Sequence, residues 1–402
     1  MIEVVFWSAV LTIAYTYALF PLLLWVRAKV RPQPIVEGDV TSSVSMVICA
    51  YNEAESIRAK LENTLALDYP RGSLQVIVAS DGSDDATNSI VEEFADRGVL
   101  LLALPRKGKI PTLNAAVGVA TGDVLVFSDA SNIYAQDAIR RLVRPLADPA
   151  VGCVAGDQRY TGGSETGASA DGERAYWSVD RKLKEWGSTA GSATSATGAI
   201  YAIRRALFRP VPPGVTDDFV ISTRAVAAGY RLVFAGEAAA YERVAAKSGV
   251  EFRRKVRVIT RGLNGLIAVR VLLDPRRYGF YSLQLFTHKF LRRFVGVPIL
   301  ILLPTSLLLW DSGSFYRLCA AAQVAFYGAA ICGGLCERAG IRVPKVAGMP
   351  FYFCMVNAAA LLGFWNVLRG RQIDRWSPRG EIKAERGNAA NDPAALRTPG
   401  KA

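Results

Sequence analysis

Histidine is almost missing from this sequence, and its cysteines follow no recognisable pattern. The only histidine, His288, stands in a basic stretch just before an apolar segment, where a lone histidine is usually a snorkelling or hydrogen-bonded structural residue. The six cysteines have neither the spacing of metal ligands nor that of a disulfide framework, and four fall in candidate membrane segments. We therefore expect reduced cysteines that serve packing, and neither a zinc domain nor a disulfide-stapled domain is indicated.

Acidic residues are also in the minority. The chain of 402 residues has 48 lysines and arginines against 35 aspartates and glutamates, which gives a formal net charge of +13. A basic excess can indicate nucleic-acid binding, but here the basic residues crowd beside apolar runs, at 27–31, 289–293 and 369–375. That placement is typical of chains held against anionic lipid with their positive residues inside. We expect membrane lipids, and no nucleic acid, as partners.

Charge is absent from the first apolar run. Residues 4–26 contain no charged side chain, and about 20 apolar residues are enough to span a bilayer. We predict an N-terminal transmembrane helix over residues 1–28. A cleaved signal peptide is disfavoured, because the positive charges follow the apolar run and no small-residue cleavage site is evident. The next domain is then expected in the cytoplasm, at the inner (cell) membrane of a multi-pass protein.

β-branched runs alternate with helix-length polar segments across residues 40–250. Strands are expected at Val44–Cys49, Leu74–Ala79 and Asp123–Phe127. The helical segments expected between them are Glu53–Leu67, Asp84–Ala95 and Pro111–Ala120. Such alternation predicts an α/β domain with a parallel sheet.

Residues 251–293 are predicted to lie at the membrane interface. Between Phe252 and Leu266, apolar residues advance by four, three, four and three positions, so they share one helical face, and four arginines fall off that face. This pattern predicts an amphipathic helix at the membrane surface over residues 252–270. An ordinary domain helix with a solvated basic side is the alternative.

Further membrane segments are expected within residues 294–370. The apolar stretches lie near 294–310, 316–336 and 347–368. Four full crossings from an outside amino terminus would leave a basic tail outside, which the positive-inside tendency opposes. We therefore expect one late segment to be re-entrant or interfacial, with the break at Pro344 or Pro350. The tail, residues 371–402, starts basic and ends rich in Ala, Asn, Pro and Gly, which predicts partial disorder.

Acidic residues follow the expected strands at the points where each strand should end in a loop. Tyr51 and Glu53 come after the first strand, Asp81 after the second and Asp129 after the third, while Asp218 lies further along in Thr-Asp-Asp-Phe. Carboxylates at the carboxyl ends of parallel strands are the usual groups that hold a nucleotide, a metal and a base. Each motif alone also fits a turn or a helix cap, but several in succession favour a binding site.

These motifs resemble those of a known family. They are Ala50-Tyr-Asn-Glu53, Asp81-Gly-Ser-Asp-Asp85, Lys107-Gly-Lys109 with Leu113-Asn114, Phe127-Ser-Asp-Ala-Ser131 and Thr216-Asp-Asp218. In this order and spacing they look like the motifs of membrane-bound family 2 glycosyltransferases, the group of cellulose- and hyaluronan-synthase-like enzymes. The resemblance covers roughly residues 40 to 300. It implies a GT-A nucleotide-sugar-binding (Rossmann-like) α/β domain flanked by transmembrane helices.

The resemblance implies how the donor is bound. Tyr51 and Glu53 would line the nucleotide pocket, and Asp81 would contact the base or ribose. Lys109 would face the diphosphate, where a cation offsets the charge of the leaving group. Asp129 matches the first position of the family's Asp-x-Asp motif, which holds a divalent cation, Mg²⁺ or Mn²⁺, on the diphosphate. A uridine diphosphate sugar is the donor expected from the resemblance.

The resemblance also implies a catalytic pair and an acceptor side. Asp218 matches the catalytic base, the second acidic residue of a pair that begins with Asp217. Arg257 is placed to contact the diphosphate. Gly198 and Tyr201 belong to a segment similar to the acceptor-side loop of the family, although a plain strand entry with a Gly turn fits it equally well. An inverting single displacement onto a lipid-linked or polysaccharide acceptor follows.

Two departures from the family pattern bear on metal binding and product. Ser131 replaces the second aspartate of the metal motif, so one hard anionic ligand is lost. The matching place for the Gln-x-x-Arg-Trp motif of processive synthases is 254–258, and it has no tryptophan. We therefore expect limited transfer, with a processive exopolysaccharide synthase as the first alternative. A membrane protein that binds nucleotide sugar without catalysis is the alternative from another class.

Overall fold

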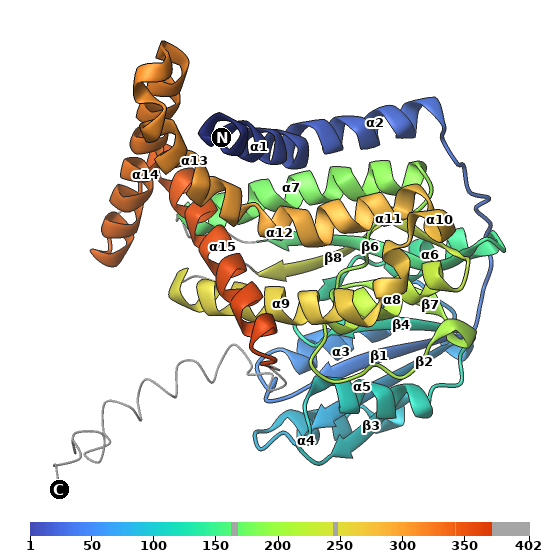
Figure 1. Ribbon diagram of the computed structural model, residues 1–402. Coiled ribbons are helices and arrows are strands. Elements are labelled where there is room, and N and C mark those ends of the chain that lie inside the picture. Colours follow the sequence, from blue (N-terminus) through green and yellow to red (C-terminus); the bar gives the residue numbers. More distant parts are fainter. Residues whose placement is uncertain (162–167, 244–247, 342, 372–402) are drawn as a thin grey trace, which may run out of the picture.

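An eight-stranded mixed sheet forms the centre of the molecule, with helices on both faces and a group of long helices at one side (Figure 1). The computed structural model describes residues 1–161, 168–243, 248–341 and 343–371. The predicted disordered tail therefore lies almost entirely outside the described residues.

The strand order is β3-β2-β1-β4-β7-β6-β8-β5. The strands are β1 Val44–Ala50, β2 Leu74–Asp81, β3 Val99–Leu104, β4 Val124–Asp129, β5 Ile133–Tyr134, β6 Val151–Thr161, β7 Tyr201–Arg204 and β8 Arg231–Arg243. The first four are mutually parallel, but β7 runs antiparallel to both β4 and β6. β6 and β8 are parallel to each other and share the direction of β1–β4, so only β7 and the short β5 run the opposite way. The expectation of a parallel sheet thus holds for six strands and is wrong for these two, whose direction the local sequence does not encode.

Both faces of the sheet are buried, which explains the continuous apolar strands. In β1, Met46 and Ile48 face one core with α3, while Val47 and Cys49 face the other with α5 and α8. Alternate side chains of a strand point to opposite faces, so a strand covered on both sides reads as an unbroken apolar run. Cys49 and Cys153 are buried free thiols, as expected for packing residues.

Helices pack around the strands, and the one expected at Pro111–Ala120 matches α5 to within two residues at each end. The helices of this domain are α3 Ile57–Leu65, α4 Thr87–Glu92, α5 Lys109–Gly118, α6 Ala138–Val143, α7 Ala168–Thr189, α8 Asp217–Ala227 and α9 Ser248–Ala268. α3 begins four residues later than predicted, because Asn52 adopts a positive φ of 52° and the chain first makes a turn. That turn keeps the residues after β1 at the edge of the sheet.

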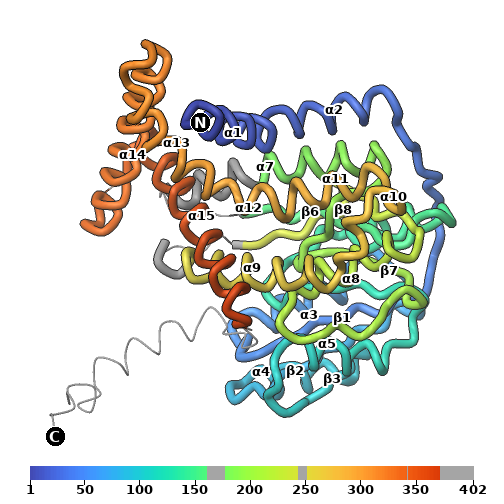
Figure 2. The backbone as a smooth tube through the Cα atoms, in the orientation of Figure 1, coloured from blue at the N-terminus to red at the C-terminus, as the bar shows by residue number. Residues whose placement is uncertain are grey.

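The N-terminal segment is one long helix with a π-helical turn in its middle. α1 spans Ile2–Ala14, the turn η1 spans Tyr15–Leu19, and α2 spans Phe20–Val30. Together they form a 29-residue candidate membrane span. The tube in Figure 2 shows α2 lying along α7, and Phe20 and Leu24 pack there with Leu183.

The C-terminal segments are also helical, and they are long and apolar. After α10 Pro275–Tyr278 come α11 Phe280–Leu285, the π-helical turn η7 Phe286–Leu291, α12 Arg292–Phe294, α13 Gly296–Leu308, α14 Ser314–Arg338 and α15 Lys345–Leu368. α14 and α15 are each long enough to cross a membrane. Leu318, Ile331 and Leu335 of α14 are each at least 60% exposed, as expected for side chains that face lipid. By length and composition, these helices are candidate membrane spans.

The sharp bend in this region is not where the prolines predicted it. Pro344 immediately precedes the first residue of α15, and Pro350 lies inside that helix. The bend of 51° instead separates Phe280–Phe294 from α13, which together are a broken span or a re-entrant loop. Pro344 is the N-cap of α15, where a missing N–H costs no intrahelical hydrogen bond. Pro350 lies in the second turn and removes one backbone hydrogen bond, but α15 continues through it to Leu368.

The helix predicted at the membrane surface is α9, and its apolar face is covered by protein. Val256, Ile259 and Leu263 are buried against Ala359 and Ala360 of α15. The expectation that this face meets lipid is therefore wrong. The pattern identified an amphipathic helix correctly, but it could not tell whether lipid or another helix covers the apolar side.

Candidate active site

Lys109 lies between two acidic residues from distant parts of the chain. Its Nζ lies 3.0 Å from Asp129 Oδ1, at the end of β4, and 3.2 Å from Asp217 Oδ2, at the start of α8. Burial favours the neutral amine, but the two carboxylates outweigh it and hold the pKa of Lys109 well above its usual value. The lysine therefore stays protonated and supplies a fixed positive charge at the carboxyl end of the sheet.

Asp217 and Asp218 are neighbours whose environments separate their acidities. Burial raises the pKa of Asp217, but Lys109 and Arg261 reverse that effect and lower it below the usual value. Burial and the charge of Asp217 raise the pKa of Asp218 to about 6. Two carboxylates pushed apart in this way are suited to different tasks. Asp217 is fitted to remain a charged partner of Lys109, and Asp218 is the candidate proton acceptor.

Gly198 leaves open a space beside the carboxylates of Asp129 and Asp218. A Cβ at this position would lie 3.6 Å from Oδ2 of Asp129 and 3.6 Å from Oδ2 of Asp218. Both oxygens therefore face one small volume beside the glycine. A reacting centre or a phosphate oxygen can enter there because no side chain fills it.

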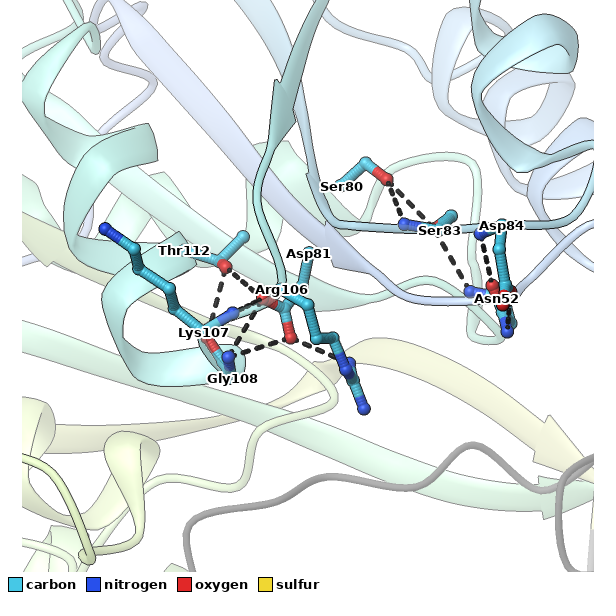
Figure 3. A network of polar contacts seen from close by, with 9 residues as sticks. All are labelled: Asn52, Ser80, Asp81, Ser83, Asp84, Arg106, Lys107, Gly108 and Thr112. Carbon is cyan, nitrogen blue, oxygen red and sulfur yellow. Dashed lines mark hydrogen bonds and ion pairs between the residues drawn. The ribbon is translucent and has the colours of Figure 1, made fainter.

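Asp81 is buried in a network of protein donors (Figure 3). Its carboxylate accepts from Arg106 Nη1 at 2.8 Å, from the backbone N–H groups of Lys107 and Gly108 at 2.8 and 2.9 Å, and from Thr112 Oγ1 at 3.1 Å. These bonds fix the loop that delivers Lys109 at the start of α5. Contact of Asp81 with a base or ribose stays a prediction, since here the carboxylate serves the loop.

Gly82 and Tyr51 complete this corner of the site. A Cβ on Gly82 would lie 2.7 Å from the backbone nitrogen of Arg106, and its φ is +65°, so only glycine allows the approach. The Arg106 guanidinium carbon lies 3.1 Å from the centroid of the Tyr51 ring. Nearby, Asn52 and Asp84 join the two loops through paired hydrogen bonds (Figure 3).

A cavity of about 760 Å³ opens from these carboxylates towards the long apolar helices. Glu53, Lys109, Asp129, Gly198 and Asp218 lie at its sheet end. Its other walls come from α9, from η7 and α12, from α15 and from the π-helical turn of the N-terminal helix. Pockets for small ligands usually have volumes of this order, and this one joins the strand ends to the membrane helices.

The cavity walls are rich in cations that the sequence analysis placed elsewhere. Arg257 lines the cavity, and burial together with Arg261 and Arg254 lowers its pKa; its contact with a diphosphate stays a prediction. Lys289, Arg292 and Arg293 also line it, and Lys289 Nζ lies 5.1 Å from the centroid of the Phe219 ring, next to Asp218. The charge pattern predicts this basic run at the membrane surface, and only the tertiary fold turns it towards the cavity.

His288 and Asp180 form a buried polar contact on the same wall. His288 Nε2 lies 3.5 Å from Asp180 Oδ1, and Lys184 Nζ lies 3.0 Å from Asp180 Oδ2. Neither Asp180 nor Lys184 was a candidate from the sequence. No motif signalled them, since they lie in α7 and meet His288 only in the folded protein.

Tyr201 is not on the acceptor side of the site. Its ring is fully buried and stacks on Phe127 with centroids 4.8 Å apart. The residue is thus a core residue of β7, and its assignment to an acceptor loop is wrong. Gly198 does line the cavity, as do Trp177 and Tyr352; aromatic side chains therefore reach the cavity although residues 254–258 contain none.

The residues present fit a divalent cation bound together with a phosphate-bearing ligand. Asp129 has a side chain that is 41% exposed and ends β4 beside Ser131, which also lines the cavity. Within the described ranges, no group of three or more His, Cys, Asp or Glu side chains could hold a metal by itself. Mg²⁺ and similar ions are often held by one or two carboxylates together with substrate phosphates, and Asp129 can supply one such ligand.

Comparison with known proteins agrees with this geometry. Residues 45–211 match the family model "Glycosyl transferase family 2". An N-acetylglucosaminyltransferase from Rhizobium sp. (strain N33) is 26% identical over 61% of this chain and 58% of its own length. Poly-beta-1,6-N-acetyl-D-glucosamine synthase from Staphylococcus aureus (strain COL) is 24% identical over 58% of this chain and 57% of its own length. The chain thus spans less than two thirds of the length of these relatives.

A solved structure extends the likeness to the membrane helices. The mannosyltransferase PcManGT from Pyrobaculum calidifontis, determined with GDP-Man and Mn²⁺, is 24% identical with a TM-score of 0.70, over 92% of this chain and 100% of that one. At this identity the likeness shows the fold alone, and the fold agrees with the mixed sheet and flanking helices described above. Residues 45–211 of this chain thus match a glycosyl transferase family 2 domain, in a fold that resembles the GT-A fold and is joined to apolar helices long enough to cross a membrane.

Proposed function

We propose that the protein is an inverting glycosyltransferase, of hexosyltransferase type, that moves a sugar from a nucleotide donor to a lipid-linked acceptor at the cytoplasmic face of the membrane. One observation carries the proposal: Lys109 is bound between Asp129 and Asp217, with Asp218 alongside, at one end of a cavity that runs to the membrane helices. A module that only binds nucleotide sugar has no need of a carboxylate such as Asp218, with a pKa raised to about 6.

The donor diphosphate is assigned to the strand ends. Lys109 provides a charge that stays positive, and Arg257 lies on the facing wall of the cavity. Both can offset the charge that develops on the leaving diphosphate. Tyr51 and Arg106 are assigned to the nucleotide end, beside the loop that Asp81 holds, and Glu53 lines the cavity beside them. The neighbouring structure with GDP-Man and Mn²⁺ supports a nucleotide-sugar ligand, and a uridine nucleotide is the donor that we propose.

Asp218 is assigned the proton transfer. Its carboxylate takes the proton of the acceptor hydroxyl while the acceptor oxygen attacks the anomeric carbon, and the bond to the diphosphate breaks on the opposite side. A base with a pKa near the working pH is best suited to this step. Asp217 keeps Lys109 in place and, by its negative charge, raises the pKa of Asp218. A single displacement inverts the configuration at the anomeric carbon.

Asp129 is assigned to a divalent cation, Mg²⁺ or Mn²⁺. Such an ion supplies charge neutralisation on the diphosphate. Its ligands from this chain would be Asp129 and, through its hydroxyl or a water, Ser131. The exposed carboxylate of Asp129 and the open space at Gly198 support this assignment.

The cavity supports a lipid-linked acceptor. It ends among Tyr352, Phe353 and Val356 of α15 and Tyr17 of the N-terminal helix, where an acyl or isoprenoid chain would find apolar surface. Of the described side chains that line it, nine are lysines or arginines and six are carboxylates. An anionic headgroup is suited to such a wall, whereas a neutral polysaccharide gains less from it.

We also propose a membrane arrangement that keeps the basic residues after α15 on the cytoplasmic side. Phe6 contacts Phe315 and Tyr316, with ring centroids 6.3 and 5.0 Å apart, so the amino terminus and the start of α14 lie together. The N-terminal helix, the bent pair and α14 would then each cross the bilayer. α15 would stay at the cytoplasmic interface against α9, which leaves Arg369 on the same side as the catalytic domain.

A product assay tests the proposal. Full-length protein in detergent is incubated with radiolabelled UDP-sugars, GDP-mannose, Mn²⁺ and a membrane lipid extract. Label that passes into organic solvent supports a lipid acceptor, and label in a high-molecular-weight polymer supports a processive synthase; the Staphylococcus relative is named a poly-beta-1,6-N-acetyl-D-glucosamine synthase. Binding of donor with no transfer under any condition would leave the non-catalytic alternative.

A further inference from the structure

Lys60 is a fully buried lysine that lies close to the candidate site and takes no part in the mechanism above. It belongs to α3 and is 0% exposed. Its Nζ has no hydrogen-bond partner among the described residues and lies 3.9 Å from the centroid of the Tyr134 ring. A cation over an aromatic face is attracted to the ring, but that attraction does not replace the lost hydration of an ammonium group.

Tyr134 connects Lys60 with both segments that carry the site. Its hydroxyl lies 3.0 Å from the carbonyl oxygen of Phe127 and 3.2 Å from that of Ala199. Phe127 lies two residues before Asp129 in β4, and Ala199 follows Gly198. One buried tyrosine thus links the backbone beside the metal ligand to the backbone beside the open space.

α3 holds this tyrosine from two sides. Asn63 Nδ2 donates to the carbonyl oxygen of Tyr134 at 2.9 Å, and the backbone N–H of Tyr134 donates to Asn63 Oδ1 at 2.8 Å. Lys60, one turn earlier in the same helix, packs on the ring itself. The helix therefore fixes both the backbone and the ring plane of Tyr134.

Stability alone gives no reason for a lysine at this position. The surrounding core is made of apolar side chains such as Ile57, Leu61 and Ile139, and a methionine of similar length would fill the volume without burying a charge. Burial lowers the pKa of Lys60 to about 7, and Asp129 is the opposing charge that raises it. The buried ammonium is therefore coupled electrostatically to the carboxylate assigned to the metal.

We propose that Lys60 is a positioning residue for donor binding, which acts through Tyr134 and through its charge. By packing on Tyr134, it keeps the Asp129 and Gly198 segments at the separation that the donor diphosphate needs. In its protonated form, Lys60 interacts with Asp129 and its charge adds to the attraction for that diphosphate. The inference rests on the proposed function, since it assumes that a nucleotide diphosphate binds at Asp129.

The test compares the affinity for UDP with Mn²⁺ and the melting temperature of full-length protein in detergent. Lys60→Met should raise or preserve the Tm, because a buried charge is removed, and should weaken UDP binding about tenfold, which corresponds to ~1.4 kcal/mol. Tyr134→Phe keeps the ring under Lys60 but loses both carbonyl contacts, and it should weaken UDP binding in the same direction. A merely structural lysine would change Tm alone.

A matched control lies on the same helix. Thr64 is buried one turn after Lys60, and its hydroxyl donates only within α3, to the carbonyl oxygen of Lys60. Thr64→Val should leave UDP affinity unchanged.

The outcomes separate two failures. If wild-type protein binds neither UDP nor GDP with Mn²⁺, the proposed function is wrong and the role of Lys60 falls with it. If wild-type protein binds UDP and Lys60→Met binds it equally well, or if Thr64→Val weakens binding as much as Lys60→Met does, only the role of Lys60 is overturned.

Discussion

Ile259 of α9 packs directly on the backbone of Gly363 in α15: a Cβ added to that glycine would lie 2.7 Å from Ile259 Cγ2. The contact joins the sheet domain to a helix apolar enough for a membrane. Two helices approach this closely only where one of them lacks a side chain. The cavity lies beside this contact, since Ile259 and Ala360 both line it.

A larger residue at position 363 should push α15 away from α9. We expect Gly363→Leu to lower the free energy of unfolding by about 1–3 kcal/mol, the usual cost of overpacking, and to reduce transfer to a lipid acceptor more than hydrolysis of the donor by water. Thermal unfolding and product analysis in detergent measure both. Gly328→Leu is the control, because that helical glycine has nothing within 4 Å of its added Cβ; equal effects of the two variants would contradict the close contact.

Asp218→Asn removes the proposed base and keeps its shape. We expect kcat to fall by about 10²–10⁴-fold, with donor affinity within a few-fold of wild type. Turnover close to the wild-type rate would show that another group accepts the proton. Asp217→Asn serves for comparison, since it removes the partner of Lys109 and should weaken donor binding as well.

The raised pKa of Asp218 also predicts two pH effects. Because the carboxylate must be ionised to accept a proton, kcat should fall as the pH drops below about 6. Because the pKa of Asp218 is higher in the folded than in the unfolded state, ionisation of Asp218 destabilises the folded protein, and this cost is fully present above pH 6. Asp218→Asn should therefore raise the Tm at pH 7.5, and this gain should shrink below pH 6. A gain of the same size at pH 5 and pH 7.5 would contradict the raised pKa.

Asp129→Ala should weaken the binding of Mn²⁺ and of the donor together, because a cation held at Asp129 would offset the charge of the donor diphosphate. Titration of Mn²⁺ at fixed UDP-sugar measures the change. Ser131→Asp restores a second carboxylate and should lower the Mn²⁺ concentration needed for half-maximal activity. Wild-type activity that survives chelation would mean that Lys109 and Arg257 neutralise the diphosphate alone.

Gly82→Ala should displace the loop that Asp81 holds. The added Cβ would meet the backbone of Arg106 at 2.7 Å, so the loop must move and Lys109 with it, and we expect weaker UDP binding. Gly98→Ala is the matched control, because Gly98 also has a positive φ but nothing within 4 Å. Both variants should lose some stability to backbone strain, while only Gly82→Ala should lose nucleotide affinity.

The sequence by itself determined the pieces of this protein that depend on local pattern. The long apolar runs and the strands before Asp81 and Asp129 indicated the fold. The order of the short motifs indicated the resemblance to family 2 glycosyltransferases. These features are local, since the spacing and length of its own apolar residues are enough to predict a strand or a spanning helix. The resemblance of the short motifs to those of a known family made Lys109, Asp129 and Asp218 candidates, and the folded chain brings them together.

Only the tertiary structure decided what each apolar or basic surface meets. The face of α9 contacts α15 and not lipid, the basic run at Lys289 turns into the cavity, β7 runs against its neighbours, and Tyr201 points into the core. Lipid tails and a protein core are equally apolar, so a hydrophobic pattern records that a face is buried without recording its partner. Strand direction and the meeting of distant side chains depend on packing of the whole chain, and no local pattern contains them.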